Sequence, residues 1–217
     1  MGRAGVFIVF EGCDGSGKTT NIARLVVELG ARGYGVTSTR EPGGTAIGEK
    51  IRSILLDSRN LRMSMRCEAL LYAASRAQLV EETIAPALER GDVVICERYY
   101  YSSLAYQAYA GGLDAGFVRR LNEWATQDIM PDLILLLDVD PKESLGRKAG
   151  GFDRIEGRTL RYHETVRNAY LALAREEPQR YRVVDGARPV EEVWGEVWGH
   201  IQKVLAHVAG KGTTCGS

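Results

Sequence analysis

The sequence predicts an α/β fold in which helices cover both faces of one parallel sheet. Short segments rich in apolar and β-branched residues alternate along the chain with segments of helical periodicity. The strongest strand candidates, residues 6–11 and 132–140, are apolar at most positions, as strands buried on both faces are. In such a sheet, ligands bind at the carboxyl ends of the strands, and the motifs described below fall at these ends.

Each expected element follows from a local pattern. Apolar residues recur at helical spacing over residues 18–32 and stop at Gly33, while Pro86 predicts a bend or break in a long helix. A single domain is expected over residues 1–208, and the small polar residues of 209–217 predict a disordered tail. The expected strands are 6–11, 35–41, 92–98, 132–140 and 181–185, and the expected helices are 18–32, 45–57, 64–90, 114–126, 142–149, 157–176 and 189–207.

The composition excludes several classes of function. The 217 residues include 28 basic and 28 acidic side chains, and this zero net charge argues against a nucleic-acid partner. Four scattered cysteines without a C-x-x-C pair argue against a disulfide framework or zinc site and indicate the cytoplasm. The start lacks a signal-peptide layout, and the richest apolar run, LILLLDV, is too short to span a membrane.

The segment EGCDGSGKTT, residues 11–20, predicts a phosphate-binding loop. Gly12, Gly17, Lys18 and Thr19 fit the pattern G-x-x-x-x-G-K-[ST], between an expected strand and an expected helix. Glycines let backbone N–H groups surround an anion, and the following helix adds its positive end. Lys18 can bridge the β- and γ-phosphates of a nucleotide, and the Thr19 hydroxyl can hold Mg²⁺.

Other segments indicate which class of nucleotide-binding protein this is. The chain has no N-K-x-D motif and no D-E pair after a strand, which disfavours guanine-specific switches and motor-type ATPases. Instead, residues 39–44 (TREPGG), 72–78 (YAASRAQ) and 96–107 (CERYYYSSLAYQ) combine arginines, aromatic rings and an amide. Those groups suit a nucleobase that carries a phosphate, so a second phosphate-bearing ligand is expected opposite the loop, as in a phosphotransferase.

Taken in order, the segments FEGCDGSGKTT, TREPGGT, YAASRAQL, ERYYYSSLAYQ, PDLILLLDVD and FDRIE closely resemble the thymidylate kinases (dTMP kinases). The resemblance covers residues 6 to about 200. It implies a P-loop nucleoside-monophosphate-kinase fold, with a five-stranded parallel sheet and a short mobile lid at about 142–157. It also implies transfer of phosphate from ATP to dTMP, with Mg²⁺ as cofactor and a homodimer as the usual assembly.

The resemblance implies residues for each substrate. On the ATP side they are Gly12, Cys13, Asp14, Gly15, Ser16, Gly17, Lys18, Thr19 and Thr20, with Arg147, Asp185 and Arg188 around the adenine. On the dTMP side they are Asp14, Arg40, Pro42, Tyr72, Arg76, Arg98, Ser102, Tyr106 and Gln107. Tyr72 matches the aromatic residue that stacks on thymine, and Arg76 matches the arginine that reaches the base O4. Ser102 has a second interpretation, as a cap of the next helix.

The resemblance also implies the catalytic residues Lys18, Arg98, Arg154, Asp14, Glu97 and Lys148. Some relatives carry an arginine in the phosphate loop, but Gly15 occupies that position here, so the lid-arginine type common in bacteria is expected. Arg154 is the favoured lid cation, ahead of Lys148. Glu97 replaces the family's usual aspartate and, with Thr19, is the expected Mg²⁺ contact.

Two other functions stay open from the residues alone. A deoxynucleoside-monophosphate kinase with broader base choice would use the same loop and a less selective pocket. A non-catalytic nucleotide-binding or regulatory protein would use the loop without needing an acceptor pocket.

Overall fold

The computed structural model describes residues 4–147 and 153–212, and the side chains of residues 4–147 and 153–208. It contains a five-stranded parallel sheet in the order β2-β3-β1-β4-β5. The strands are β1 (Val6–Glu11), β2 (Val36–Arg40), β3 (Val93–Glu97), β4 (Leu133–Asp138) and β5 (Tyr181–Asp185). The predicted α/β class and parallel sheet are therefore confirmed.

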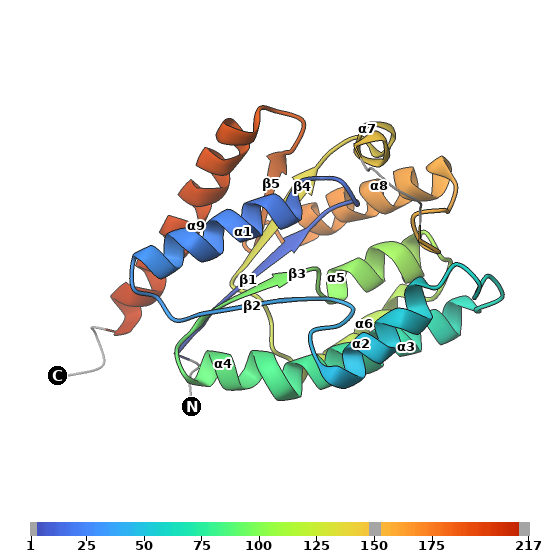
Figure 1. Cartoon of the computed structure of the whole chain (residues 1–217), viewed down its shortest axis with the longest axis horizontal. Helices are drawn as coiled ribbons and strands as arrows, with labels where there is room; N and C mark the ends of the chain where they lie inside the picture. Colours follow the sequence, from blue (N-terminus) through green and yellow to red (C-terminus); the bar gives the residue numbers. More distant parts are fainter. Residues whose placement is uncertain (1–3, 148–152, 213–217) are drawn as a thin grey trace.

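Helices cover both faces of this sheet (Figure 1). They are α1 (Lys18–Ala31), α2 (Ala46–Leu56), α3 (Met65–Leu79), α4 (Ala85–Glu89), α5 (Tyr100–Ser103), α6 (Ala115–Thr126), α7 (Pro141–Gly146), α8 (Leu160–Glu176) and α9 (Val190–Gly212). Two π-helical turns, η1 (Val80–Ile84) and η2 (Leu104–Tyr109), continue α3 and α5. None of the helices in the described residues combines the length and apolar character needed to cross a bilayer.

Alternating residues of the strands build two cores. Ile8 and Phe10 of β1 pack with Leu25 of α1 and Val197 of α9 on one face. On the other face, Phe7 packs with side chains of α3–α6 and α8. All six residues of β1 are buried, and each large apolar side chain contributes about 1.5–3 kcal/mol through that burial. This central strand is thus a rigid base for the loop that follows it.

The segment after β3 differs from the sequence-based expectation. No helix is expected over residues 100–109, yet α5 and η2 form there. Tyr99 meets Phe7 edge-on at 5.0 Å, and Tyr101 meets Tyr181 at 5.4 Å. Contacts with distant residues therefore stabilise this helix, and Ser102 lies inside it. The interpretation of Ser102 as a helix cap is wrong.

The long helix predicted over residues 64–90 changes character before Pro86. The chain stays helical but passes from α3 through η1 into α4. Pro86 has no N–H to donate to the preceding turn, and the wider π-helical spacing of η1 accommodates that loss.

The last helix is longer than expected. It continues past residue 209, where a disordered tail is predicted, to Gly212, because a helix packed on the sheet through Leu205 can extend cooperatively by a further turn. Residues 213–217 lie outside the described part of the chain.

Candidate active site

The carboxyl ends of β1, β2 and β3 meet at a cavity of about 580 Å³, a volume that suits a nucleotide-sized ligand. Its lining comes from the phosphate loop, the 40–42 segment, α2, α3, the segment that follows β3, and residues 153–156. The strand register explains this convergence, because Phe10 of β1 and Arg40 of β2 both pair with Glu97 of β3. The segments expected to bind ATP and those expected to bind dTMP therefore line the same cavity.

Close packing shapes the phosphate loop. Gly15 has φ of +77°, and a Cβ there would lie 2.1 Å from the carbonyl oxygen of Ser144 in α7. A Cβ on Gly12 would lie 2.4 Å from the carbonyl oxygen of Leu137. Behind the loop, Gly17 is the N-cap residue of α1, and no side chain of the described residues caps this helix, unlike α2, which Thr45 caps. The first N–H groups of α1 are therefore available to an anion.

Lys18 is buried and folds back over the loop. Its ammonium group donates to the carbonyl oxygens of Gly12, at 3.2 Å, and Cys13, at 2.9 Å. Burial lowers the pKa of Lys18, and the nearby Arg98 lowers it further. Cys13 is also buried, which raises the pKa of its thiol to about 11, so it acts as a neutral spacer in the loop.

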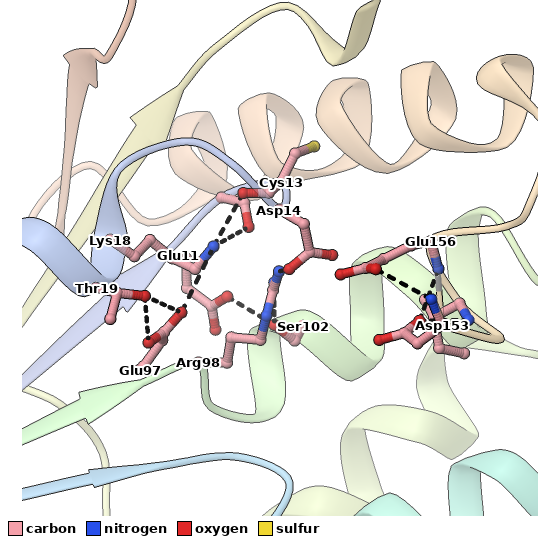
Figure 2. A network of polar contacts seen from close by, with 12 residues as sticks. Glu11, Cys13, Asp14, Lys18, Thr19, Glu97, Arg98, Ser102, Asp153 and Glu156 are labelled. Atoms are coloured by element: carbon pink, nitrogen blue, oxygen red, sulfur yellow. Dashed lines mark hydrogen bonds and ion pairs between the residues drawn. The ribbon is translucent and has the colours of Figure 1, made fainter. Parts of the chain in front are cut away.

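Thr19 and Glu97 lie side by side at the mouth of the loop (Figure 2). The Thr19 hydroxyl donates to Glu97 Oε2 at 3.1 Å, and Glu97 Oε1 lies 3.9 Å from the Lys18 ammonium. A hydroxyl and a carboxylate are hard oxygen donors, the type that Mg²⁺ prefers. Within the described residues, no cluster of three His, Cys, Asp or Glu side chains could hold a metal alone. Phosphate oxygens of a nucleotide would thus have to complete an Mg²⁺ site here.

Arg98 lies between the two halves of the cavity. Its backbone has φ of +69°, a strained value for a residue with a side chain. The guanidinium donates to Asp14 Oδ1 at 2.8 Å and to the Ser102 hydroxyl at 3.3 Å (Figure 2). It also donates to the Tyr170 hydroxyl at 3.2 Å. It also lies 5.4 Å from the Tyr106 ring centre. A fixed positive charge therefore faces the space between the phosphate loop and the opposite wall.

Glu11, which the sequence analysis assigned no role, holds Arg98 in place. It is fully buried, and its carboxylate accepts from the Tyr99 N–H at 2.9 Å, Ser102 Oγ at 2.7 Å and the Tyr170 hydroxyl at 2.8 Å. Burial raises the pKa of Glu11, although Arg98 and these three donors oppose that effect. Because Tyr99 follows Arg98, and Ser102 and Tyr170 contact its guanidinium, one carboxylate orients both backbone and side chain of Arg98.

The wall opposite the phosphate loop contains most of the expected dTMP residues. Arg40, Pro42, Tyr72, Tyr106 and Gln107 all line the cavity. Arg40 pairs with Glu49 of α2 at 2.9 Å. The Tyr106 hydroxyl is buried and has no hydrogen-bond partner among the described residues, so a ligand could supply one.

Arg76 lies one layer behind this wall. It is 1% exposed, and its guanidinium bonds to Glu41, at 2.5 Å, to Ser103, at 3.1 Å, and to Asn122. Glu41 and Ser103 line the cavity, whereas Arg76 does not. Ser102 also lines the cavity but uses its hydroxyl on Glu11 and Tyr170. Direct base contacts of Arg76 and Ser102 remain predictions.

Arg154 is buried and does not line the cavity. Its Nη1 donates to Glu68 Oε2 at 2.7 Å and its Nε to the Leu55 carbonyl at 2.7 Å. Its Nη2 is buried without a partner among the described residues. The other expected lid cation, Lys148, lies outside the described residues.

Arg147 lines the phosphate-loop side of the cavity. It donates to the Gly186 carbonyl at 3.1 Å and pairs with Glu143 at 2.6 Å. Asp185 and Arg188 belong to the same loop as Gly186, and neither lines the cavity. The structure therefore brings Arg147 to the 185–188 loop, the arrangement expected around an adenine ring.

Sequence reasoning missed several residues at this site. Glu11 lies beside the phosphate motif, and the available signal was an acidic residue at the end of an otherwise apolar strand. Arg52, Asp153 and Glu156 also line the cavity, but no local pattern distinguishes them from surface charges. Glu68 has no sequence signal either, because its partners lie 39 to 90 residues away.

The chain is similar to known proteins along most of its length. The profile of a protein family described as Thymidylate kinase matches residues 10–197. A thymidylate kinase of Symbiobacterium thermophilum is 50% identical over 201 residues, which cover 92% of this chain and 94% of that protein. Thymidylate kinases of Deinococcus radiodurans and Bacillus pumilus are 46% and 42% identical, covering 92% and 93% of this chain and 97% of each relative.

Proposed function

This chain belongs to the thymidylate kinase family, and from that premise we propose that it transfers the γ-phosphoryl group of ATP to dTMP, giving ADP and dTDP. One observation carries the proposal: a single cavity joins a phosphate loop to an aromatic and amide wall, with Arg98 between them. The enzyme is thus a dTMP kinase that binds two phosphate-bearing substrates face to face.

The donor is assigned to the phosphate loop. The N–H groups of residues 12–20 and the Lys18 ammonium would surround the ATP phosphates. Arg147 and the 185–188 loop would hold the adenine, an assignment that the Arg147–Gly186 hydrogen bond supports. In this arrangement Lys18 exchanges its contacts with Gly12 and Cys13 for phosphate oxygens.

The acceptor is assigned to the opposite wall. Tyr72 would stack on thymine, and Gln107 would hydrogen-bond to the base edge. The unpartnered Tyr106 hydroxyl would meet the deoxyribose or its phosphate. Arg40 and Arg98 would bind the acceptor phosphate, with Asp14 near the sugar and Pro42 as part of the wall.

In the reaction, an oxygen of the dTMP phosphate attacks the γ-phosphorus of ATP, and the bond from that phosphorus to the β–γ bridging oxygen breaks. Catalysis rests on aligning the two phosphates and neutralising their repulsion with Lys18 and Arg98. Thr19 and Glu97 would hold Mg²⁺, which would supply positive charge that offsets the negative charge of the nucleotide phosphates. Little acid–base chemistry is needed from the protein.

Arg154 is our candidate for the cation that contacts the transferring phosphoryl group, which makes this a lid-arginine enzyme. Two observations support that assignment. Gly15 cannot be replaced by an arginine without displacing the backbone of α7 at Ser144. Arg154 also keeps one buried Nη group without a protein partner in the described chain. To reach the phosphates, Arg154 has to leave Glu68 and Leu55.

We further propose a cytoplasmic homodimer. The thiols of Cys13, Cys67 and Cys96 are unpaired, which suits a reducing compartment. For the dimer, exposed apolar side chains on two packed helices offer a surface: Trp124 and Phe117, seven positions apart on α6, and Leu70 on α3.

The test is ADP release with Mg·ATP against dTMP, dUMP, dCMP, dGMP, dAMP, UMP and no acceptor. Strong turnover with dTMP, weaker turnover with dUMP and little with the others is expected, and Lys18→Ala should remove it. Equal use of several acceptors would instead support a kinase of broader base choice. ATP binding without acceptor-dependent turnover would support a non-catalytic nucleotide-binding protein.

A further inference from the structure

Glu68 of α3 connects the acceptor wall to the segment that carries Arg154. It is fully buried, and its two carboxylate oxygens have different partners. Oε2 accepts from Arg154 at 2.7 Å and from Arg158 at 2.5 Å. Oε1 accepts from the Nε2 amide group of Gln107 at 2.9 Å. The local sequence around Glu68 predicts no role for it.

The charge on Glu68 determines how the Gln107 amide is turned. Two guanidinium groups on one buried oxygen stabilise the ionised carboxylate, and an ionised carboxylate can only accept hydrogen bonds. Gln107 must therefore present its NH₂ group to Glu68. Its carbonyl oxygen is then the end of the amide left for the cavity that Gln107 lines.

A carbonyl oxygen at this position selects between bases. Thymine carries a hydrogen on N3 and can donate to it, whereas cytosine N3 has a lone pair and would face another acceptor. Resting on the proposed function, we propose that Glu68 is a specificity-positioning residue, which excludes cytosine nucleotides by locking the Gln107 amide with its carbonyl toward the base.

The substitution Glu68→Gln tests this directly. The new amide has nearly the shape of the carboxylate but can donate as well as accept. The Gln107 amide can then turn over and present its NH₂ group to a base, which suits cytosine N3. The variant should therefore lose preference for dTMP over dCMP, and not merely lose activity.

The experiment measures kcat/KM for dTMP, dUMP and dCMP with Mg·ATP in the wild type, Glu68→Gln and Arg158→Lys. We expect the dTMP-to-dCMP ratio to fall by about tenfold or more in Glu68→Gln, the size of one hydrogen bond made or left unpaired. The dTMP-to-dUMP ratio should stay within about twofold, since both bases carry a hydrogen on N3.

Arg158→Lys is the matched control, because it changes a partner of Oε2 while keeping a positive charge beside it, and it leaves the Oε1–Gln107 bond intact. It should keep the wild-type dTMP-to-dCMP ratio. An unchanged ratio in Glu68→Gln, or an equal fall in Arg158→Lys, would overturn the role of Glu68. Failure of the wild type to phosphorylate dTMP would instead overturn the proposed function.

If Glu68→Gln does not fold, hydrogen exchange of the Gln107 side-chain amide in the wild type tests the proposal instead. Its NMR signals can be assigned by their loss in Gln107→Leu. Slow hydrogen exchange of this amide, in the free and dTMP-bound enzyme, is expected when Glu68 holds it. Exchange as fast as that of surface amides would overturn the proposal.

Discussion

Two buried carboxylates, Glu11 and Glu68, place groups that line the active-site cavity without lining it themselves. Glu11 holds Arg98, and Glu68 holds Gln107. Within the described residues each accepts three hydrogen bonds, from two distant side chains and a backbone N–H for Glu11 and from three distant side chains for Glu68, which offset the cost of burying a charge. The position of an active-site arginine or amide is therefore set by a residue one layer deeper.

At the scale of single residues, Glu11→Gln should lower kcat by about 10- to 100-fold, which corresponds to a rise of about 1–3 kcal/mol in the activation free energy. An amide cannot accept from all three donors, so the backbone and guanidinium of Arg98 lose their common anchor. The KM for ATP should change much less, because Glu11 does not line the phosphate side. Steady-state kinetics with dTMP and Mg·ATP measure both parameters.

An Arg98→Ala background provides the control for Glu11→Gln. If Glu11 acts by positioning Arg98, the second substitution should add little to the first. Fully additive losses, or a kcat within twofold of wild type for Glu11→Gln alone, would contradict the positioning role.

Arg76→Ala should lower the free energy of unfolding, and this loss has to be measured before any effect on dTMP binding is interpreted. Removing one partner of the buried Arg76–Glu41 pair leaves an uncompensated charge and costs about 3–5 kcal/mol. Chemical denaturation would measure this loss. Unfolding free energy within 1 kcal/mol of the wild type, together with weaker dTMP binding, would instead support a direct contact with the base.

At the scale of elements, the phosphate loop and α7 are in backbone contact at Gly15. Gly15→Ala should lower kcat/KM for ATP by about tenfold or more and lower the melting temperature, because a Cβ would meet the Ser144 carbonyl at 2.1 Å. Gly33→Ala is the matched control, since Gly33 has a similar φ of +81° and nothing within 4 Å. Equal effects of the two substitutions would show that the contact with α7 is unimportant.

Arg154 lies in the segment that leads from residue 153 into α8. If Arg154 contacts the transferring phosphoryl group, Arg154→Ala should lower kcat by about 10³-fold and change the KM for ATP little. Arg161→Ala, at an exposed position on α8, is the control and should leave both constants unchanged. A raised KM with kcat intact would make Arg154 a residue that only binds ATP.

For the whole molecule, the proposed homodimer has a specific surface. Trp124 is 81% exposed, an unusual state for so large an apolar side chain. Trp124→Glu should halve the mass in light scattering, from two 23.9 kDa chains to one. Val27→Glu, on α1 and 72% exposed, should leave the mass unchanged. A wild-type monomer, or a dimeric Trp124→Glu, would contradict this interface.

The fold was predictable because its signals are local. Strands that are apolar on both faces and helices with regular periodicity specify the α/β class whatever else they contact. The helix from α5 into η2 was not predictable in this way, since tyrosines packed on Phe7 and Tyr181 stabilise it. The break in the long helix was predictable only as far as Pro86, and not as a π-helical turn.

The sequence by itself determined the phosphate loop, its place after β1, and the family, since these depend on contiguous residues. Only the tertiary structure decided that Arg76 lies behind the wall, that Arg154 bonds to Glu68, and that Glu11 anchors Arg98. The physical reason is burial: a charged side chain removed from water must find a partner, and that partner can lie anywhere in the chain.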